Sequence, residues 1–274
     1  MSFNKEYIDE TNAIRENISN IRNKIIVMSG KGGVGKSTIS SNLAGFLSLE
    51  GFQTGLLDID LHGPSIPKLL GLSGKSLEII GDKLSPIEYS STLKTVSIGF
   101  MLKSEDESII WRGPKKNSMI RQFLKDVHWG NLDYLIIDSP PGTGDEQLSI
   151  IQTTGDLNGA VIVTTPQDIS LIDVKKSINF CRQLNLPIIG IIENMSGLIC
   201  PKCNERINVF KSNGGKELAE EEKIPFLGKI SLDPSTANNC DNGTLTINSN
   251  ASRINRDEMM FAFKNILERK EQIK

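Results

Sequence analysis

The sequence contains few of the residues that usually build metal centres or cross-linked scaffolds. It has two histidines, too few for a histidine metal centre, and only four cysteines among 274 residues. So few cysteines in a chain of this length do not suggest a disulfide framework. They are better explained by metal or redox chemistry in a reducing compartment.

The sequence also lacks an excess of one charge and any long apolar run. Lysine and arginine total 31 against 33 acidic residues, which leaves a net charge of -2 and gives no electrostatic reason to expect a nucleic-acid partner. No apolar stretch approaches the roughly 20 residues that a membrane-spanning helix needs, and the N-terminus does not resemble a secretory signal. These absences predict a cytoplasmic protein that binds neither membrane nor nucleic acid.

Short apolar runs alternate with helical patterns along the chain. The runs are rich in Val, Ile and Leu throughout, which is typical of strands covered on both faces, as in a parallel sheet with crossover helices. We therefore predict an α/β fold with a doubly wound, mostly parallel sheet flanked by helices, forming a single domain over residues 1–274. The runs lie at 24–28, 54–60, 132–138, 159–165, 186–192 and 225–230.

Two segments depart from this alternation. Ile14, Ile18 and Ile21 recur at helical spacing and predict a leading amphipathic helix over about 1–22, which packs on the domain that follows. Residues 77–99 have a shorter period, with Gly81-Asp82 between two apolar stretches, and predict a hairpin inserted into the α/β scheme.

A glycine-rich motif follows the first apolar run. SGKGGVGKST, residues 29–38, fits the pattern G-x-x-x-x-G-K-[ST] and stands between a strand pattern and a helix pattern, as a phosphate-binding loop does. Glycines let backbone N-H groups turn towards phosphate, Lys36 supplies a charge for the β and γ phosphates, and the Ser37 hydroxyl is a ligand for Mg²⁺. This context favours a nucleotide site over a glycine-rich turn without a ligand. The predicted contacts are Gly30, Lys31, Gly32, Gly33, Val34, Gly35, Lys36, Ser37 and Thr38.

Three aspartates follow predicted strands. Asp58 and Asp60 come after the second run, and Asp138 ends the run 132–138. An open α/β sheet places its ligand crevice at the carboxyl ends of its strands, and carboxylates there hold the waters of a magnesium ion or orient the attacking water. For each aspartate the alternative is a helix cap or a solvated loop position.

The nucleobase preference is read from one asparagine. The N-K-x-D run of guanine-specific P-loop proteins is missing from the sequence. ENMSG, residues 193–197, places Asn194 just past a predicted strand, and the family resemblance described below implies that this asparagine contacts adenine. ATP is therefore favoured over GTP.

Cys200 and Cys203 in LICPKCNE have the spacing with which two thiolates grip one metal centre. Thiolate centres usually need four ligands, and a 4Fe-4S cluster and Zn²⁺ fit such a set equally well. Cys181 follows a helical pattern and is predicted to be a small buried hydrophobe, whereas Cys240 is a weak candidate for an extra ligand. A thioredoxin-type redox pair is disfavoured because the motif sits in a loop and not at the start of a helix.

Several long motifs resemble one family. KGGVGKST resembles the deviant Walker A motif of the family that contains MinD, ParA, the nitrogenase iron protein and the Mrp/ApbC-type iron-sulfur carriers. The stretches DIDLHGPSIPKLLGL, DYLIIDSPPGTGDEQL, VIVTTPQDISLIDVKKSI and GIIENMSGLICPKC narrow the resemblance to the Mrp/ApbC carriers, over about Lys24 to Gly243. The resemblance implies a P-loop NTPase of the SIMIBI class.

The resemblance also implies roles for particular residues. In that family the signature lysine, here Lys31, reaches the phosphates on the other subunit, which implies a nucleotide-sandwiched homodimer. Asp60 matches the water-activating switch I position, Asp58 and Asp138 support the metal, and Gly142 in PPGTGD is placed to sense the γ phosphate. Lys31, Lys36 and Asp60 are therefore the predicted catalytic residues.

A homodimer would supply the missing thiolates, because Cys200 and Cys203 of each subunit can meet at the two-fold axis. The resemblance favours a bridging 4Fe-4S cluster over Zn²⁺. It implies a carrier that binds and hydrolyses ATP, with Mg²⁺, assembles the cluster at the dimer interface and transfers it to apo iron-sulfur proteins.

Two other functions fit parts of the sequence. A MinD/ParA-like positioning ATPase that binds membrane or DNA would need a basic amphipathic C-terminus. The segment 256–274 is apolar on one helical face, but its interspersed acidic residues favour a last helix packed on the sheet. ATP-driven electron transfer, as in the nitrogenase iron protein, is disfavoured because that protein takes single cysteines from two separate loops. The apolar face is formed by Met259, Met260, Phe263, Ile266 and Leu267.

Overall fold

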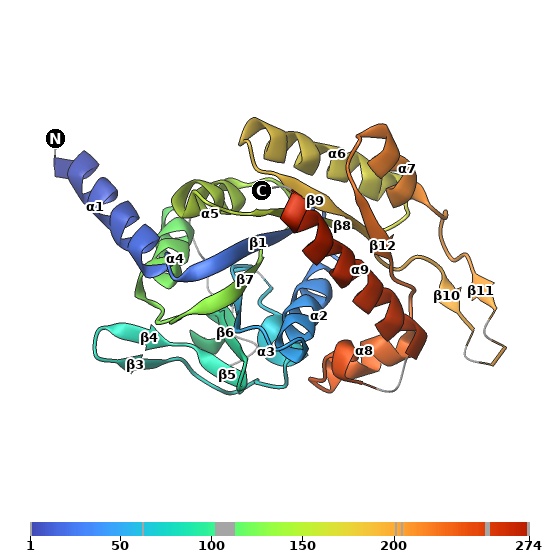
Figure 1. Cartoon of the computed structure of the whole chain (residues 1–274), viewed down its shortest axis with the longest axis horizontal. Coiled ribbons are helices and arrows are strands. Elements are labelled where there is room, and N and C mark those ends of the chain that lie inside the picture. The colour runs from blue at the N-terminus through green and yellow to red at the C-terminus, as the bar shows by residue number, and fades with distance from the viewer. Residues whose placement is uncertain are drawn as a thin grey trace.

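The computed structural model describes residues 2–61, 63–101, 113–200, 202–203, 205–249 and 253–272. An eight-stranded sheet runs through it in the order β12-β9-β8-β1-β7-β2-β6-β5 (Figure 1). Every neighbouring pair is parallel except β5 and β6. The strands are β1 (Ile21–Ser29), β2 (Thr54–Asp58), β5 (Ile87–Ser90), β6 (Leu93–Ser97), β7 (Leu132–Asp138), β8 (Gly159–Thr164), β9 (Ile188–Glu193) and β12 (Phe226–Lys229).

Helices cover both faces of this sheet (Figure 1). Ile25 and Val27 of β1 pack with α2 (Lys36–Leu49), α3 (Ile66–Leu69) and α9 (Arg253–Gln272) in one apolar cluster. Ile26 and Met28 point the other way, as alternation along a strand requires, into a second cluster. This cluster and a third one, around Ile162 and Ile191, hold most of the remaining helices. These are α1 (Ser2–Asn17), α4 (Gly113–Asp126), α5 (Asp145–Thr154), α6 (Asp168–Gln183) and α7 (Gly214–Glu221), while α8 (Pro234–Asp241) packs against α3.

The predicted doubly wound fold is confirmed. All six apolar runs are strands, and the run at 132–138 coincides with β7. The C-terminal helix also packs on the sheet, because Met259, Phe263 and Ile266 of α9 are buried. No helix in the described part of the chain is both long and apolar enough to cross a membrane.

The N-terminal helix is shorter than predicted. It ends at Asn17, and Ile21 is the first residue of β1 and not part of a continued helix. Ile14, Ile18 and Ile21 are all buried in the same cluster. A tight turn, with the Ile21 amide bonded to the Ile18 carbonyl, keeps the apolar spacing although the helix has ended.

The segment 77–99, predicted to be one hairpin, contains two hairpins. β3 (Glu78–Ile80) and β4 (Lys83–Ser85) pair antiparallel around Gly81-Asp82, as predicted. β5 and β6 form a second hairpin, and β6 joins the main sheet parallel to β2 because its buried Leu93 and Val96 extend the core.

Three short elements complete the described chain. Two are 3₁₀ helices, η1 (Ile98–Met101) and η2 (Thr246–Asn248). The third is a small hairpin of β10 (Leu198–Ile199) and β11 (Arg206–Ile207), which follows β9 at the carboxyl edge of the sheet. The phosphate loop, the three aspartates and the cysteine pair all follow strand ends at this edge.

A phosphate loop beside a cysteine hairpin

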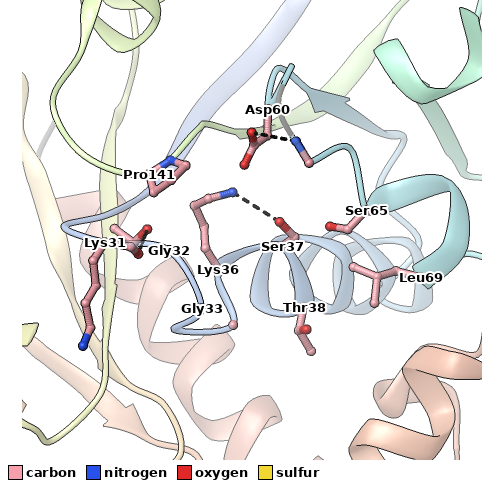
Figure 2. A pocket seen from close by; sticks show the side chains of 13 residues that line it. Lys31, Gly32, Gly33, Lys36, Ser37, Thr38, Asp60, Ser65, Leu69 and Pro141 are labelled. Atoms are coloured by element: carbon pink, nitrogen blue, oxygen red, sulfur yellow. Dashed lines mark hydrogen bonds between the residues drawn. The ribbon is translucent and has the colours of Figure 1, made fainter. Parts of the chain in front are cut away.

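The glycine-rich loop borders a pocket of about 290 Å³ between β1 and α2 (Figure 2). Gly33 and Gly35 have φ of 79° and 84°, in the left-handed region that other residues rarely adopt. Gly30 is needed for another reason, because a Cβ there would lie 2.4 Å from the backbone carbon of Asp173 in α6. The predicted residues that line the pocket are Lys31, Gly32, Gly33, Gly35, Lys36, Ser37, Thr38 and Asp60.

Of the two lysines that line the described pocket, Lys36 is the one that is almost fully buried. Its Nζ donates to Asp138 Oδ1 at 2.8 Å and to Ser37 Oγ at 3.2 Å. Asp138 also accepts from the Ser37 hydroxyl at 2.6 Å and from the Ser40 hydroxyl at 2.7 Å. The lysine and the predicted metal-binding hydroxyl are thus held by one buried carboxylate at the start of α2.

Asp58 lies beside Asp138, because these two residues are register partners at the ends of β2 and β7. Both carboxylates are inaccessible to solvent. Burial, and then the charge of Asp138, raise the pKa of Asp58 to about 8, although Ser97, Lys36 and the Asp60 amide oppose the shift. Asp58 therefore keeps its proton at neutral pH in the metal-free protein, and Lys36 balances the charge of Asp138. The Ser37 hydroxyl and the two carboxyl groups supply oxygen atoms only. This oxygen-rich set suits Mg²⁺, so the residues present fit the predicted magnesium ion.

Asp60 and Lys31 lie at opposite sides of the same pocket. Asp60 Oδ1 accepts from the Gly63 amide at 3.3 Å, so its carboxylate stands over the loop and Lys36 (Figure 2). Lys31 points away from Lys36, and its Nζ lies 3.4 Å from Gln167 Oε1. The charge aimed into this subunit's own pocket is therefore that of Lys36, and the cross-subunit role of Lys31 stays a prediction.

The predicted switch II segment is anchored at both ends. Gly142 has φ of 89°, and its amide donates to the Ser29 carbonyl at 2.8 Å. Gln147, which is fully buried in the first turn of α5, donates to Pro140 O at 2.6 Å and accepts from the Gly144 amide at 2.9 Å. Sequence reasoning did not single out Gln147, which holds this segment in place. Its position three residues after Gly144, as in a capping box, is the signal that marks it.

Asn194 lies behind the loop and does not line the pocket. Its Nδ2 donates to the Val34 carbonyl at 2.9 Å, and a Cβ on Gly35 would lie 2.2 Å from that nitrogen. Val34 is buried beneath the loop in the same way. The structure thus gives Asn194 a contact with the loop backbone that the sequence did not predict, and its contact with adenine stays a prediction.

Cys200 and Cys203 lie in the turn between β10 and β11. Cys203 is exposed and Cys200 is partly exposed. The backbone N-H groups of Lys202 and then Cys203 donate to the Cys200 sulfur and lower the pKa of this thiol below its ordinary value. A turn whose amides point at a sulfur stabilises a thiolate, the form that binds metal.

The other two cysteines lie elsewhere. Cys181 is buried in α6, as predicted, and burial raises the pKa of its thiol to about 12. Cys240 in α8 lies 3.9 Å from the Thr38 hydroxyl, beside the phosphate loop and not beside the hairpin. Among the residues described here, no group of three or more His, Cys, Asp or Glu side chains could hold a metal ion. This part of the chain offers a metal two thiolates.

A doubly wound sheet with a glycine-rich loop after its first strand, a buried lysine and carboxylates on neighbouring strand ends defines a P-loop nucleotide-binding protein. A model described as "ParA: NUBPL iron-transfer P-loop NTPase" matches residues 20–268. The chain belongs to this family of NUBPL-type iron-transfer P-loop NTPases. The resemblance to Mrp/ApbC-type carriers is thereby confirmed.

Two curated relatives are similar over most of the chain. An iron-sulfur cluster carrier protein of Methanocaldococcus jannaschii is 53% identical over 230 residues, which cover 84% of this chain and 79% of the relative. A cytosolic Fe-S cluster assembly factor NUBP2 homolog of Dictyostelium discoideum is 55% identical over 219 residues, covering 78% and 83%.

Solved structures agree with the fold. A nucleotide-binding protein of Archaeoglobus fulgidus in complex with ADP has 40% identity and a TM-score of 0.76, covering 86% of this chain and 92% of that one. The cell division ATPase MinD of Pyrococcus furiosus has 18% identity and a TM-score of 0.64, covering 90% and 99%, and shows the fold alone.

Proposed function

We propose that the protein is an ATP-dependent iron-sulfur carrier, which receives a 4Fe-4S cluster as cargo and transfers it to apo iron-sulfur proteins. The observation that carries the proposal is the solvent-accessible pair of Cys203, which is exposed, and Cys200, which is partly exposed, on the same sheet edge as a complete phosphate loop. Membership of the iron-transfer family, and the name of the Methanocaldococcus jannaschii relative, support the same cargo. The Dictyostelium discoideum relative is named as cytosolic, which supports a cytoplasmic location.

The nucleotide in this proposal is ATP with Mg²⁺. Lys36 and the loop amides bind the β and γ phosphates, while Ser37, Asp58 and Asp138 hold the magnesium ion and its waters. The ion neutralises phosphate charge when bound. Asp60 orients the attacking water above the loop, and Gly142 reports the γ phosphate to switch II. The name of the Archaeoglobus fulgidus protein, which is in complex with ADP, supports an adenine nucleotide.

The functional unit in this proposal is a homodimer. Two thiolates per chain do not complete a 4Fe-4S cluster, and a second copy provides the other two through a two-fold axis. Lys31, which points away from its own Lys36, contacts the phosphates bound to the partner subunit. In this arrangement the same dimer interface contains both the Lys31 contact to nucleotide and the shared cluster, so nucleotide binding affects the geometry of the cluster site.

Anaerobic reconstitution with iron and sulfide tests the cargo. The wild type should gain a broad absorbance near about 400 nm, as thiolate-bound clusters do, and should activate an apo 4Fe-4S enzyme added to it. Cys200→Ser and Cys203→Ser should lose both properties but keep ATP binding, because the phosphate loop is separate from the hairpin. Cys181→Ser is the matched control and should keep all three. A Cys203→Ser protein that still activates the enzyme would refute the carrier site.

A nucleotide-dependent dimer is tested by Lys31→Ala. Light scattering with a slowly hydrolysed ATP analogue should show dimerisation of the wild type and a monomeric Lys31→Ala protein that still binds ATP. Normal dimerisation of the variant would count against the cross-subunit contact.

A further inference from the structure

The cysteine hairpin is too small to hold its own shape. β10 and β11 share two residue pairs, Leu198 with Ile207 and Ile199 with Arg206, and pair with no other named strand in the described chain. An isolated two-stranded hairpin is marginally stable at best, even when it is longer than this one. Contacts outside the hairpin must therefore fix the positions of Cys200 and Cys203.

Arg206 makes the principal side-chain contacts of this kind. Its Nη1 donates to the Ser196 carbonyl at 2.8 Å, and its Nη2 donates to Glu258 Oε1 at 2.6 Å. Glu258, on α9, also accepts from the Ser231 amide at 2.7 Å and from the Ser231 hydroxyl at 3.0 Å. One carboxylate of the C-terminal helix thus joins the hairpin to the segment that follows β12.

The root of the hairpin is tied to the same segment by its backbone. The Leu232 amide donates to the Gly197 carbonyl at 2.7 Å, and the Ser196 amide donates to the Ile230 carbonyl at 2.9 Å. Residues 196–197 are therefore fixed from both sides, by Arg206 on the hairpin and by the strand end at 230–232.

Asn194, two residues before Ser196, is hydrogen-bonded to the phosphate loop. Asn194 Nδ2 holds the Val34 carbonyl, and the buried Glu193 accepts from the Ser196 hydroxyl at 2.5 Å and from the Gly215 amide at 2.6 Å. Met195, between Asn194 and Ser196, has φ of 56°. A non-glycine residue keeps this left-handed conformation only where its surroundings enforce it. Hydrogen bonds and the backbone of residues 193–197 therefore connect the phosphate loop to Arg206, which is three residues from Cys203.

We propose that Arg206 is a positioning residue, which clamps the cysteine hairpin to residues 193–197 so that nucleotide in the phosphate loop sets the geometry of the two thiolates. The planar guanidinium is required because it holds the two acceptors with two separate nitrogens in a fixed fork, whereas a lysine has a single nitrogen on a flexible stem. The inference rests on the proposed function for the identity of the cargo, but the clamp itself does not depend on a bound cluster.

Amide hydrogen exchange of the metal-free protein tests the clamp, with and without a slowly hydrolysed ATP analogue and Mg²⁺. Peptides covering 196–207 should exchange on the order of 10-fold faster in Arg206→Met than in the wild type, because the hairpin then opens locally. The analogue should slow this exchange in the wild type and leave it unchanged in Arg206→Met. ATP affinity by calorimetry should stay within about 2-fold, since the pocket is not touched.

Arg182→Met is the matched control. Arg182 donates to Glu222 Oε2 at 2.6 Å and to the Glu222 carbonyl at 2.8 Å, and this pair has nearly the same exposure as the Arg206 pair, 48% and 20% against 40% and 20%. It joins α6 to the end of α7, away from the hairpin, so its loss should not change exchange at 196–207.

Two further variants separate the clamp from simpler explanations. Arg206→Lys keeps the charge and should still lose the nucleotide response. Arg206→Met combined with Glu258→Met also removes the carboxylate that has lost its cation, and its hairpin should stay loosened. Exchange at 196–207 that matches the wild type in Arg206→Met, or that still slows with the analogue, would overturn the inference. Because no cluster is present in these measurements, that result would leave the reconstitution experiment unaffected.

Discussion

Lys36→Met tests two roles of this lysine, the ion pair with Asp138 and the charge offered to the phosphates. The buried ion pair sets the size of the expected loss of stability. Lys36 and Asp138 are 2.8 Å apart, with side chains that are 6% and 1% exposed. Removing one partner of a buried pair costs about 3–5 kcal/mol of unfolding free energy, because the remaining charge is left without compensation. We expect a loss of this size in the nucleotide-free protein.

The loss should depend on pH in a direction that Asp58 sets. The pKa of Asp58 is about 8, well above its unfolded value, so the folded state loses stability as pH rises from the unfolded pKa to about 8, and the loss levels off there. Lys36 lowers this pKa, and Lys36→Met must therefore raise it further. The deficit against the wild type should be largest near pH 8.5 and smaller near pH 6.5, with a slope of at most about 1.4 kcal/mol per pH unit for this one group.

Urea unfolding at both pH values measures this deficit, with Lys31→Met as the control on the same loop. Lys31 is partly exposed, and within the described residues its side chain makes one hydrogen bond, of 3.4 Å to Gln167, so its loss should change stability by no more than about 0.5 kcal/mol. ATP with Mg²⁺ should raise the melting temperature of Lys31→Met but not of Lys36→Met. Equal stability of the two variants at pH 8.5 would refute the assignment of Lys36 as the cation of the buried carboxylates.

Three other substitutions test separate parts of the nucleotide site. Asp60→Asn should keep ATP affinity in calorimetry while phosphate release slows on the order of 100-fold or more, and wild-type turnover would reassign the water-orienting role. Asp58→Asn should raise the melting temperature of the nucleotide-free protein at pH 8 by removing a buried repulsion, and should lose the further rise that Mg²⁺ with ATP gives; a lower melting temperature without nucleotide would contradict the repulsion. Gln147→Ala should slow phosphate release about 10-fold or more with ATP affinity unchanged, because Gly142 and Gly144 lose the side chain that fixes them. An unchanged rate of phosphate release would show that the hydrogen bond from the Gly142 amide to the Ser29 carbonyl is enough to hold switch II.

The sequence predicted the fold and the phosphate loop because both are local patterns. β7 at 132–138 is mostly apolar and almost wholly buried, and SGKGGVGKST stands between a strand and a helix. Local spacing failed at Ile21, where the same interval fits a helical turn and a tight turn into a strand. A periodic signal does not distinguish them when both bury the residue in one cluster.

The remaining parts of the site depend on contacts between distant segments. Arg206 and Glu258 are 52 positions apart, and Asn194 meets Val34 over 160 positions. No spacing rule joins such residues, so their bonds became visible only in the structure. Gln147 is an intermediate case. Its hydrogen bonds to Pro140 and Gly144 are local in sequence, but its burial depends on the packing of α5 against the sheet.

The central claim is that two copies of the chain share one cluster through Cys200 and Cys203. Iron and sulfide analysis of the anaerobically reconstituted protein, combined with the mass of the intact complex under native conditions, tests it most directly. The account predicts a dimer with about four irons and four sulfides, roughly two of each per chain, and a Cys203→Ser protein that retains neither. About four irons per chain on a monomer, or a cluster that persists in Cys203→Ser, would contradict it.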